Sequence, residues 1–235
     1  SLLIVVGIFF LTFAAFDHWY NFFNALTPLV FATLIAAAIL ADEPKGYIQR
    51  VALCVFGFAL FGSAMGHIGY MANDVDYRPR VILLLLSVEA NDVFANLTGK
   101  TFGRRKLCPN TSPNKTIAGA VGALILTTLL VVGVGWFAYA GTALQDWRLL
   151  ALLGALVSIS GQFGDLALSS IKRDLGIKDM GVLIPGHGGL LDRFDSLLLA
   201  APVYFHFVGY VVGFGINVGD QYRIFTSATV LRMGE

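Results

Sequence analysis

Residues 169–195 gather side chains that could bind a negatively charged phosphate ligand together with a metal ion. The stretch reads SSIKRDLGIKDMGVLIPGHGGLLDRFD and lies between two strongly apolar segments. Ionised groups are costly beside apolar sequence unless they are paired or hold a ligand. Because cationic side chains bind phosphates and carboxylates bind Mg²⁺, the mixture predicts a multiply charged phosphate substrate and a divalent cation. Its ionisable residues are Lys172, Arg173, Asp174, Lys178, Asp179, His187, Asp192, Arg193 and Asp195.

Two further carboxylate-bearing segments lie late in apolar stretches upstream of these residues. The first, EAND at 89–92, contains Glu89, Asn91 and Asp92, and the second, GQFGD at 161–165, ends at Asp165. An ionised carboxylate inside a membrane segment costs at least about 2.5–3.5 kcal/mol on insertion scales, so each is a functional candidate.

Helical spacing places some of these groups on common faces. Asp165, Ser169 and Lys172 share one stripe of a helix. Asp192 and Asp195 share another. If the two stripes face each other, they could hold Mg²⁺ with a phosphate bridging it.

Two loops could contribute to the same site. The turn PGHGG at 185–189 immediately precedes a predicted helix, so it offers free backbone N–H groups to an anion. Its candidate residues are His187, Gly188 and Gly189. The second loop, SPNKT at 112–116, places Ser112, Lys115 and Thr116 at another helix entry, where they could cradle a phosphate.

The rest of the sequence is that of an integral membrane protein. Of the 235 residues, 57% are hydrophobic and only 13% are charged, and the mean hydropathy is +0.74. A soluble domain carries about twice that charged fraction. We therefore expect an all-α polytopic membrane protein with about seven transmembrane helices and a polar active-site cavity that faces the cytoplasm. Spans of about 20 apolar residues are expected at 2–16, 22–41, 48–71, 81–97, 117–140, 149–168 and 190–214.

The chain reads as one membrane domain, with N-terminal helices at 1–90, catalytic helices and loops at 91–215 and a tail at 216–235. Its start at Ser1, inside an apolar run, indicates a truncated or processed N-terminus. If the helices alternate in direction, eleven Lys and Arg residues lie on one side and five on the other. The positive-inside rule then places the basic loops, and the candidate site, in the cytoplasm. This predicts a multi-pass protein of the inner (cytoplasmic) membrane.

Simpler interpretations apply to some of these residues. A single intramembrane pair such as Asp165 with Lys172 could serve helix packing alone. The basic run at 104–106 is a topology signal that could equally attract anionic lipid headgroups. Asp74 and Asp76 are expected to be solvated loop charges, and His67 and His206 to be packing residues.

The motifs together resemble the phosphatidate cytidylyltransferase family, also called CDP-diacylglycerol synthases. The resemblance covers about residues 91–195. It is carried in the C-terminal block by Ser169, Lys172, Arg173, Lys178, Asp179, Gly181, Pro185, His187, Gly188, Gly189, Asp192, Arg193 and Asp195, and upstream by Asn91, Asp92, Phe102, Gly103, Arg104, Ser112, Pro113, Lys115, Thr116, Gly161, Gly164 and Asp165. Asn96 and Ala118 depart from the family pattern.

The resemblance implies that CTP and phosphatidic acid react to give CDP-diacylglycerol and pyrophosphate, with one or two Mg²⁺ ions. It implies metal binding by Asp165, Asp192 and Asp195. It implies catalytic roles for Asp165, Lys172, Arg173, Asp192 and Arg193. The implied substrate-binding residues are Asn91, Asp92, Ser112, Lys115, Thr116, Ser169, Lys178, Asp179, His187, Gly188 and Gly189.

Several alternatives remain open from the sequence. The acceptor of a CTP-dependent reaction could be another lipid, as in a polyprenol kinase-like enzyme or an ether-lipid CDP synthase. Buried carboxylates also occur in ion-coupled transporters. The sequence also leaves open whether the protein forms a homodimer. Nucleic-acid binding is not expected, because the basic residues line a membrane face.

Overall fold

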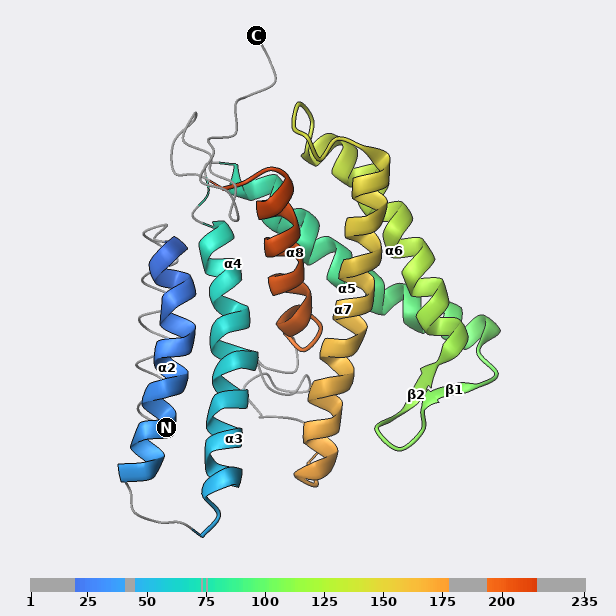
Figure 1. Cartoon of the computed structure of the whole chain (residues 1–235). Coiled ribbons are helices and arrows are strands. Elements are labelled where there is room, and N and C mark those ends of the chain that lie inside the picture. Colours follow the sequence, from blue (N-terminus) through green and yellow to red (C-terminus); the bar gives the residue numbers. More distant parts are fainter. Residues whose placement is uncertain (1–19, 41–44, 73, 75, 178–193, 215–235) are drawn as a thin grey trace, which may run out of the picture.

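The computed structural model describes residues 20–40, 45–72, 74, 76–177 and 194–214, which form a bundle of helices and one small hairpin (Figure 1). The predicted span 2–16 and the tail lie outside these residues. In chain order the elements are α2 (Tyr20–Leu40), α3 (Tyr47–Gly57), the π-helix η1 (Phe58–Ser63), α4 (Ala64–Ala72), α5 (Tyr77–Phe102), β1 (Lys106–Cys108), β2 (Ser112–Thr116), α6 (Ile117–Ala138), α7 (Trp147–Asp174) and α8 (Leu197–Val211).

The other six predicted spans coincide with helical segments, although their ends differ by several residues. Among the described residues, α5, α6 and α7 are long and apolar enough to cross a membrane, and α8 and the segment Tyr47–Leu60 are shorter apolar helices. The outer faces of the long helices are apolar: Ile82 is 59% exposed, Val121 50% and Phe137 80%. Such faces suit contact with lipid. The seven crossings and their orientation stay predictions.

The loop expected between two spans contains a two-stranded antiparallel hairpin. β1 pairs with β2 in the register Lys106↔Thr116 and Cys108↔Ser112. The hairpin leads directly into α6. Thr116, the last residue of β2, caps that helix: its hydroxyl accepts a hydrogen bond of 3.1 Å from the Gly119 N–H. A threonine at this position satisfies a backbone donor that the helix itself cannot pair.

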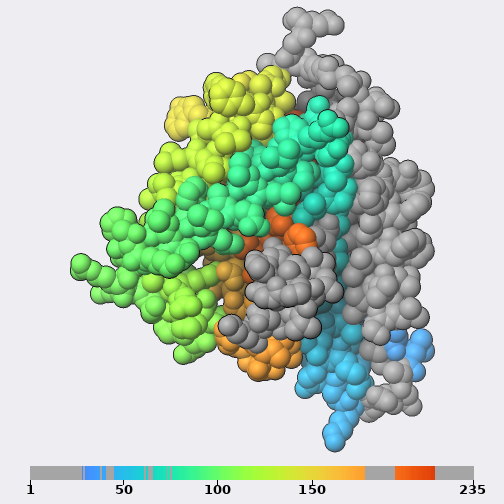
Figure 2. Space-filling view, turned by 180° about the vertical axis from the view of Figure 1, so that it is seen from behind, coloured from blue at the N-terminus to red at the C-terminus, as the bar shows by residue number. Residues whose placement is uncertain are grey.

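Small residues bring α5 and α6 into close contact next to the hairpin. A Cβ atom on Gly119 would lie 2.7 Å from the Ala95 carbonyl oxygen and 3.2 Å from the Cα of Gly99. The Thr98 hydroxyl donates to the Gly119 carbonyl at 3.3 Å across the same contact. Backbone approach of this kind is typical of membrane helix pairs. Figure 2 shows α5, in green, crossing the rear face of the molecule toward the hairpin.

The core surrounds α8, which packs against α4 and α7 (Figure 1). Tyr204, Phe205 and Val208 on α8 are fully buried. His67 lies beside them, with its ring centroid 4.8 Å from that of Phe205 and 5.1 Å from that of His206. These ring contacts agree with the expected packing role of the two histidines.

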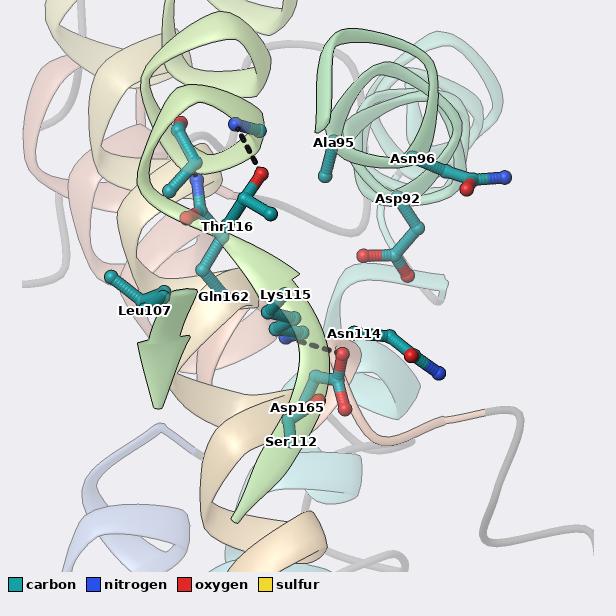
Figure 3. A pocket seen from close by; sticks show the side chains of 12 residues that line it. Asp92, Ala95, Asn96, Leu107, Ser112, Asn114, Lys115, Thr116, Gln162 and Asp165 are labelled. Carbon is teal, nitrogen blue, oxygen red and sulfur yellow. Dashed lines mark hydrogen bonds and ion pairs between the residues drawn. The ribbon is translucent and has the colours of Figure 1, made fainter. Parts of the chain in front are cut away.

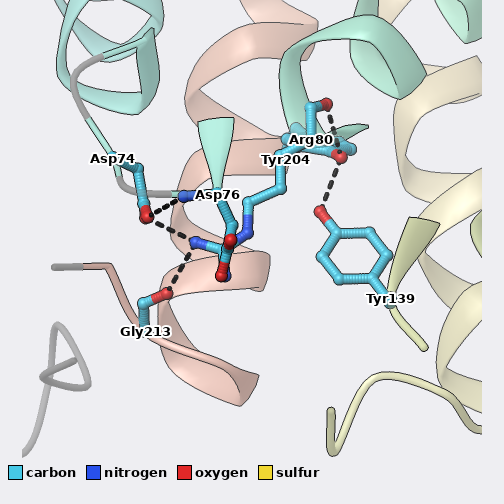
Figure 4. A network of polar contacts seen from close by, with 6 residues as sticks. All are labelled: Asp74, Asp76, Arg80, Tyr139, Tyr204 and Gly213. Carbon is cyan, nitrogen blue, oxygen red and sulfur yellow. Dashed lines mark hydrogen bonds and ion pairs between the residues drawn. The ribbon is translucent and has the colours of Figure 1, made fainter. Parts of the chain in front are cut away.

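A buried polar network joins the C-terminal end of α8 to the start of α5 (Figure 4). Arg80 forms an ion pair with Asp74, and its guanidinium also donates to the Gly213 carbonyl at 3.3 Å. The Tyr204 hydroxyl donates to the Arg80 carbonyl at 2.9 Å and lies 2.6 Å from the Tyr139 hydroxyl. The network therefore connects α5, α8 and the end of α6.

The expectation that Asp74 is solvated is wrong. Its side chain is 0% exposed and that of Arg80 is 2% exposed, whereas the Asp76 side chain is 56% exposed. Asp74 is buried because the guanidinium neutralises it and because its second oxygen accepts the Asp76 N–H at 3.1 Å. Asp76 fits the expectation by its exposure, and its carboxylate lies 3.9 Å from the Arg80 guanidinium, a distance at which an exposed pair contributes little.

We predict that Arg80→Met destabilises the protein by about 3–5 kcal/mol, because it leaves a buried carboxylate without its charge partner. Chemical denaturation in detergent would measure the loss. The double variant Arg80→Met/Asp74→Leu should recover much of it, and Asp76→Asn, the matched control, should change stability by less than about 0.5 kcal/mol. An Arg80→Met protein as stable as the wild type would contradict a stabilising role for the pair.

Candidate active site

A pocket of about 350 Å³ opens between the hairpin, α5, α6 and α7 (Figure 3). Its volume is within the range of small-molecule sites. The lining combines acidic, basic, amide and small side chains: Asp92, Ala95, Asn96, Leu107, Ser112, Asn114, Lys115, Thr116, Gly119, Ala120, Gln162 and Asp165.

An ion pair between the hairpin and α7 forms one wall of the pocket. The Lys115 ammonium lies 2.5 Å from a carboxylate oxygen of Asp165, and the two side chains are 22% and 21% exposed. The other Asp165 oxygen accepts the Ser169 hydroxyl at 3.1 Å. This bond confirms that Asp165 and Ser169 share a stripe of α7. In Figure 3 the lysine and the aspartate point toward each other across the pocket wall.

A second pair of carboxylates lies where α5 meets the start of α8. Asp92 on α5 accepts the Ser196 hydroxyl at 3.1 Å, and Asp195 accepts the Ser196 N–H at 2.7 Å. Ser196 therefore lies between two carboxylates from distant parts of the sequence. The carboxylate of Asp92 interacts electrostatically with those of Asp165 and Asp195. The three acidic residues thus form one charged region.

The pKa of Asp195, which lies outside the helices, is shifted by these interactions. Burial raises the pKa of its carboxyl to about 6, and the negative charge of Asp165 adds to the increase. The Ser196 N–H, Lys172 and Lys115 act in the opposite direction. Burial and repulsion from Asp165 both disfavour the ionised form of Asp195, and a bound cation would stabilise that form.

Glycines on α7 let this helix approach the residues before α8. A Cβ atom on Gly164 would lie 2.6 Å from the Asp195 carbonyl oxygen and 3.1 Å from that of Ser196. No side chain fits at that distance without moving the backbone. Gly164 therefore allows Asp195 to approach α7, which carries Asp165.

Asn91 supports the site from the interior of the bundle. It is fully buried, and its carbonyl oxygen accepts the hydroxyls of Thr127 at 3.2 Å and Ser158 at 2.5 Å. Its amide nitrogen has no hydrogen-bond partner among the described residues. Asn91 joins α5, α6 and α7 one residue before Asp92, and it is not among the residues that line the pocket.

The acidic residues partly match what a divalent cation requires. Their oxygen atoms are the ligands that Mg²⁺ prefers. However, no group of three or more potential ligands is close enough to form a metal site within the described parts of the chain. The ion pair with Lys115 also occupies one oxygen of Asp165.

The described predicted residues fall into two sets. Asp92, Ser112, Lys115, Thr116 and Asp165 line the pocket. Ser169 is linked to it by a hydrogen bond to Asp165, and Asp195 interacts electrostatically with Asp165. Lys172 acts electrostatically on Asp195, while Arg173 is exposed and donates to the Thr111 carbonyl at 3.3 Å. The residues that lie outside the described structure are Lys178, Asp179, His187, Gly188, Gly189, Asp192 and Arg193.

Ser196 and Gln162 are among the residues of the site that were not predicted from the sequence. Ser196 bridges Asp92 and Asp195, and Gln162 lines the pocket one turn before Asp165 on the same helix. Its place in the motif GQFGD, three residues before the aspartate, is a signal that could have identified Gln162. Nothing local in the sequence marks Ser196.

The sequence is similar to one protein family and to several known proteins. A model of the cytidylyltransferase family matches residues 1–211. The chain is 37% identical over 197 residues to the uncharacterized protein YnbB of Escherichia coli K12, covering 81% of this chain and 65% of that protein. It is 39% identical over 170 residues to a phosphatidate cytidylyltransferase of Staphylococcus haemolyticus, covering 72% of this chain and 63% of that protein. It is 30% identical over 185 residues to a phosphatidate cytidylyltransferase of Staphylococcus aureus strain COL, covering 79% of this chain and 69% of that protein.

The close approach at Gly164 predicts a selective effect of one methyl group. Gly164→Ala should lower stability by about 1–3 kcal/mol, because the added carbon forces the Asp195 segment away from α7. Gly133→Ala is the control, since a Cβ there meets nothing within 4 Å, and it should be neutral or stabilising by up to about 1 kcal/mol. Equal thermal stability of the two variants would show that α7 and the Asp195 segment are not tightly packed.

Proposed function

The chain belongs to the cytidylyltransferase family, and on that premise we propose that it joins CTP and phosphatidic acid into CDP-diacylglycerol and pyrophosphate. The main structural support is the meeting of Asp92, Asp165, Asp195 and Lys115 beside one pocket. Two of the relatives are named for this activity. The chain spans less than two thirds of the length of the first two relatives.

The proposed reaction is a substitution at the α-phosphorus of CTP. A phosphate oxygen of the lipid forms a bond to that phosphorus, and the bond to the bridging oxygen of the leaving pyrophosphate breaks. The lipid phosphate is already ionised at neutral pH, so no general base is required. Because both reactants are anions, catalysis consists of positioning them and compensating their charge.

Several cationic and hydroxyl side chains of the described residues would bind the phosphates. Lys115, released from Asp165 by a competing ligand, would bind a phosphate oxygen, with Ser112 and the backbone of the hairpin beside it. Lys172 and Arg173 would bind the triphosphate from the end of α7. Both lie in the last turn of that helix.

The predicted residues outside the described structure complete the proposal through the family resemblance. Lys178, Asp179 and the turn with His187, Gly188 and Gly189 would bind substrate. Asp192 and Arg193 would act at the reacting phosphates.

A divalent cation would be held by Asp165 and Asp195 with Asp192, as the resemblance implies, and Asp92 would lie in the same charged region. When bound, one or two such ions would compensate the negative charge of the phosphate groups. The chain's own contribution is to orient these carboxylates through Ser169 and Ser196 and to exclude bulk water by packing α7 against the start of α8.

We further propose that the site faces the cytoplasm in the inner membrane, where CTP is available. The excess of Lys and Arg in the loops on that side supports this orientation. The acyl chains of the lipid would enter between helices from the bilayer. The sequence leaves a homodimer open.

A direct assay tests the activity. Purified protein given CTP labelled at the α-phosphate and phosphatidic acid should form labelled CDP-diacylglycerol and one pyrophosphate per product, and a chelator should abolish turnover. Asp165→Asn should lower kcat by at least about 100-fold, because it removes a charge that the reaction requires. Asp76→Asn, at an exposed carboxylate, should leave kcat unchanged.

The same assay separates the other readings. Transfer of the γ-phosphate, with CDP as the by-product, would identify a kinase acting on a different lipid. A preference for ether-linked phosphatidic acid or for a polyprenyl phosphate would show that the acceptor is a different lipid. Absence of any chemistry together with solute flux in vesicles would identify a transporter.

The pKa of Asp195 predicts how cation binding depends on pH. A carboxyl with a pKa of about 6 becomes protonated as pH falls through 6, and the proton then competes with the metal ion. Divalent-cation affinity should therefore be full above about pH 7 and fall by up to about tenfold per pH unit below 6. Binding of Mn²⁺ measured between pH 5 and 8 tests this, and equal affinity at pH 5 and pH 7 would contradict it. In Asp195→Asn the decline should shift to lower pH.

A further inference from the structure

Gln162 presents its side-chain amide in a single orientation. The amide nitrogen donates to the Ala120 carbonyl oxygen on α6 at 3.2 Å and to the Ser158 hydroxyl at 3.1 Å. A backbone carbonyl can only accept a hydrogen bond, so the atom facing Ala120 has to be nitrogen. The carbonyl oxygen of Gln162 is left without a hydrogen bond from any described residue, in a side chain that lines the pocket.

A buried relay fixes this orientation from behind. The Ser158 hydroxyl gives its only proton to Asn91 at 2.5 Å, so it has to accept from Gln162. Thr127 donates to the same oxygen of Asn91 at 3.2 Å. Asn91, Thr127 and Ser158 are each 0% exposed. Rotating the Gln162 amide would place its oxygen against two acceptors, the Ala120 carbonyl and the Ser158 hydroxyl oxygen, and both hydrogen bonds would be lost.

The position of Gln162 relative to the charged wall matches the dimensions of a nucleotide. Gln162 and Asp165 are three residues apart on α7, so their Cβ atoms are about 5–6 Å apart on one face. Asp165 pairs with Lys115 in the wall where phosphates would bind. A ribose spans a distance of this order, so a nucleotide with phosphates at that wall brings its base to Gln162.

The rest of the lining leaves room for a flat ring. Ala95, Gly119 and Ala120 carry a methyl group or no side chain, and Leu107 adds an apolar surface. Gln162 adds to this lining a polar side chain whose amide orientation is fixed by the protein.

We propose that Gln162 determines base specificity by accepting a hydrogen bond from the exocyclic amino group of cytosine. This inference rests on the proposed use of CTP. Cytosine carries an amino donor at position 4, whereas uracil carries a carbonyl oxygen there. The oxygen of Gln162 pairs with the former and repels the latter, and the relay prevents the amide from turning to suit uracil.

The test compares nucleotides in the wild type and in Gln162→Met, which preserves length but has no strong acceptor. The wild type should prefer CTP over UTP in kcat/KM, and Gln162→Met should lower that preference by about 10–100-fold, mainly through a higher KM for CTP. The KM for phosphatidic acid should stay the same. Gln49→Met, at an exposed glutamine on α3, should behave as the wild type.

A modified nucleotide and a second variant extend this test. CTP methylated twice at the amino group has no donor, so the wild type should discriminate against it and Gln162→Met should not. If Gln162→Met does not fold, Ser158→Ala removes one anchor of the amide, and the preference should fall by about 2–5-fold. Product formation with an unchanged CTP preference in Gln162→Met would overturn the assignment while leaving the proposed function intact.

A wild type without turnover would instead refute the proposed function. Equilibrium binding of CTP and UTP by calorimetry would then still test Gln162. Tighter binding of CTP that weakens in Gln162→Met supports its role, and equal binding of the two nucleotides refutes it.

Discussion

Repulsion among acidic side chains is the constraint around which this part of the protein is built. Asp92, Asp165 and Asp195 come from three separate segments and share a half-buried region in which few cations oppose them. The Lys115–Asp165 ion pair relieves the repulsion in part and also attaches the hairpin to α7. The surrounding architecture, including the absence of a side chain at Gly164, brings the charges closer together than their mutual repulsion favours. Arrangements of this kind occur where a ligand supplies the missing positive charge.

α8 is held at both ends by hydrogen bonds to α5. At its start, Ser196 donates to Asp92. At its midpoint Tyr204 donates to the Arg80 carbonyl, and just past its C-terminal end the Gly213 carbonyl accepts a hydrogen bond from the Arg80 guanidinium. Both partners lie on one continuous helix, so the spacing of the two attachments is fixed by the rise of α5. The buried ion pair of Arg80 with Asp74 adds a charged contact to the distant end. The position of Asp195 thus depends on polar contacts well away from the pocket.

The sequence was most informative where one local property determines the outcome. Runs of apolar residues located the helices, and helical spacing correctly paired Asp165 with Ser169. It was least informative where a distant partner decides. Asp74 resembles a solvated loop residue until Arg80 is placed beside it. The hydroxyl partners of the Asn91 oxygen, Thr127 and Ser158, lie on other helices, where no local pattern indicates them. The partner of Asp165 was likewise set by the hairpin, whose pairing brings Lys115 rather than Lys172 to its carboxylate. Such contacts join residues separated by tens of positions, beyond any local pattern.

The attachment of the hairpin has a kinetic consequence. Lys115 immediately precedes Thr116, which caps α6, and β1 follows closely after α5, so both ends of the hairpin are joined to helices in close backbone contact. The ammonium group can therefore leave Asp165 by rotation about its own side-chain bonds, without displacement of the strand. Side-chain rotations of this kind take picoseconds to nanoseconds, whereas movements of whole elements take microseconds or longer. Exchange of the lysine between the aspartate and an incoming anion would then be far faster than a typical enzyme turnover, and would not be the step that limits it.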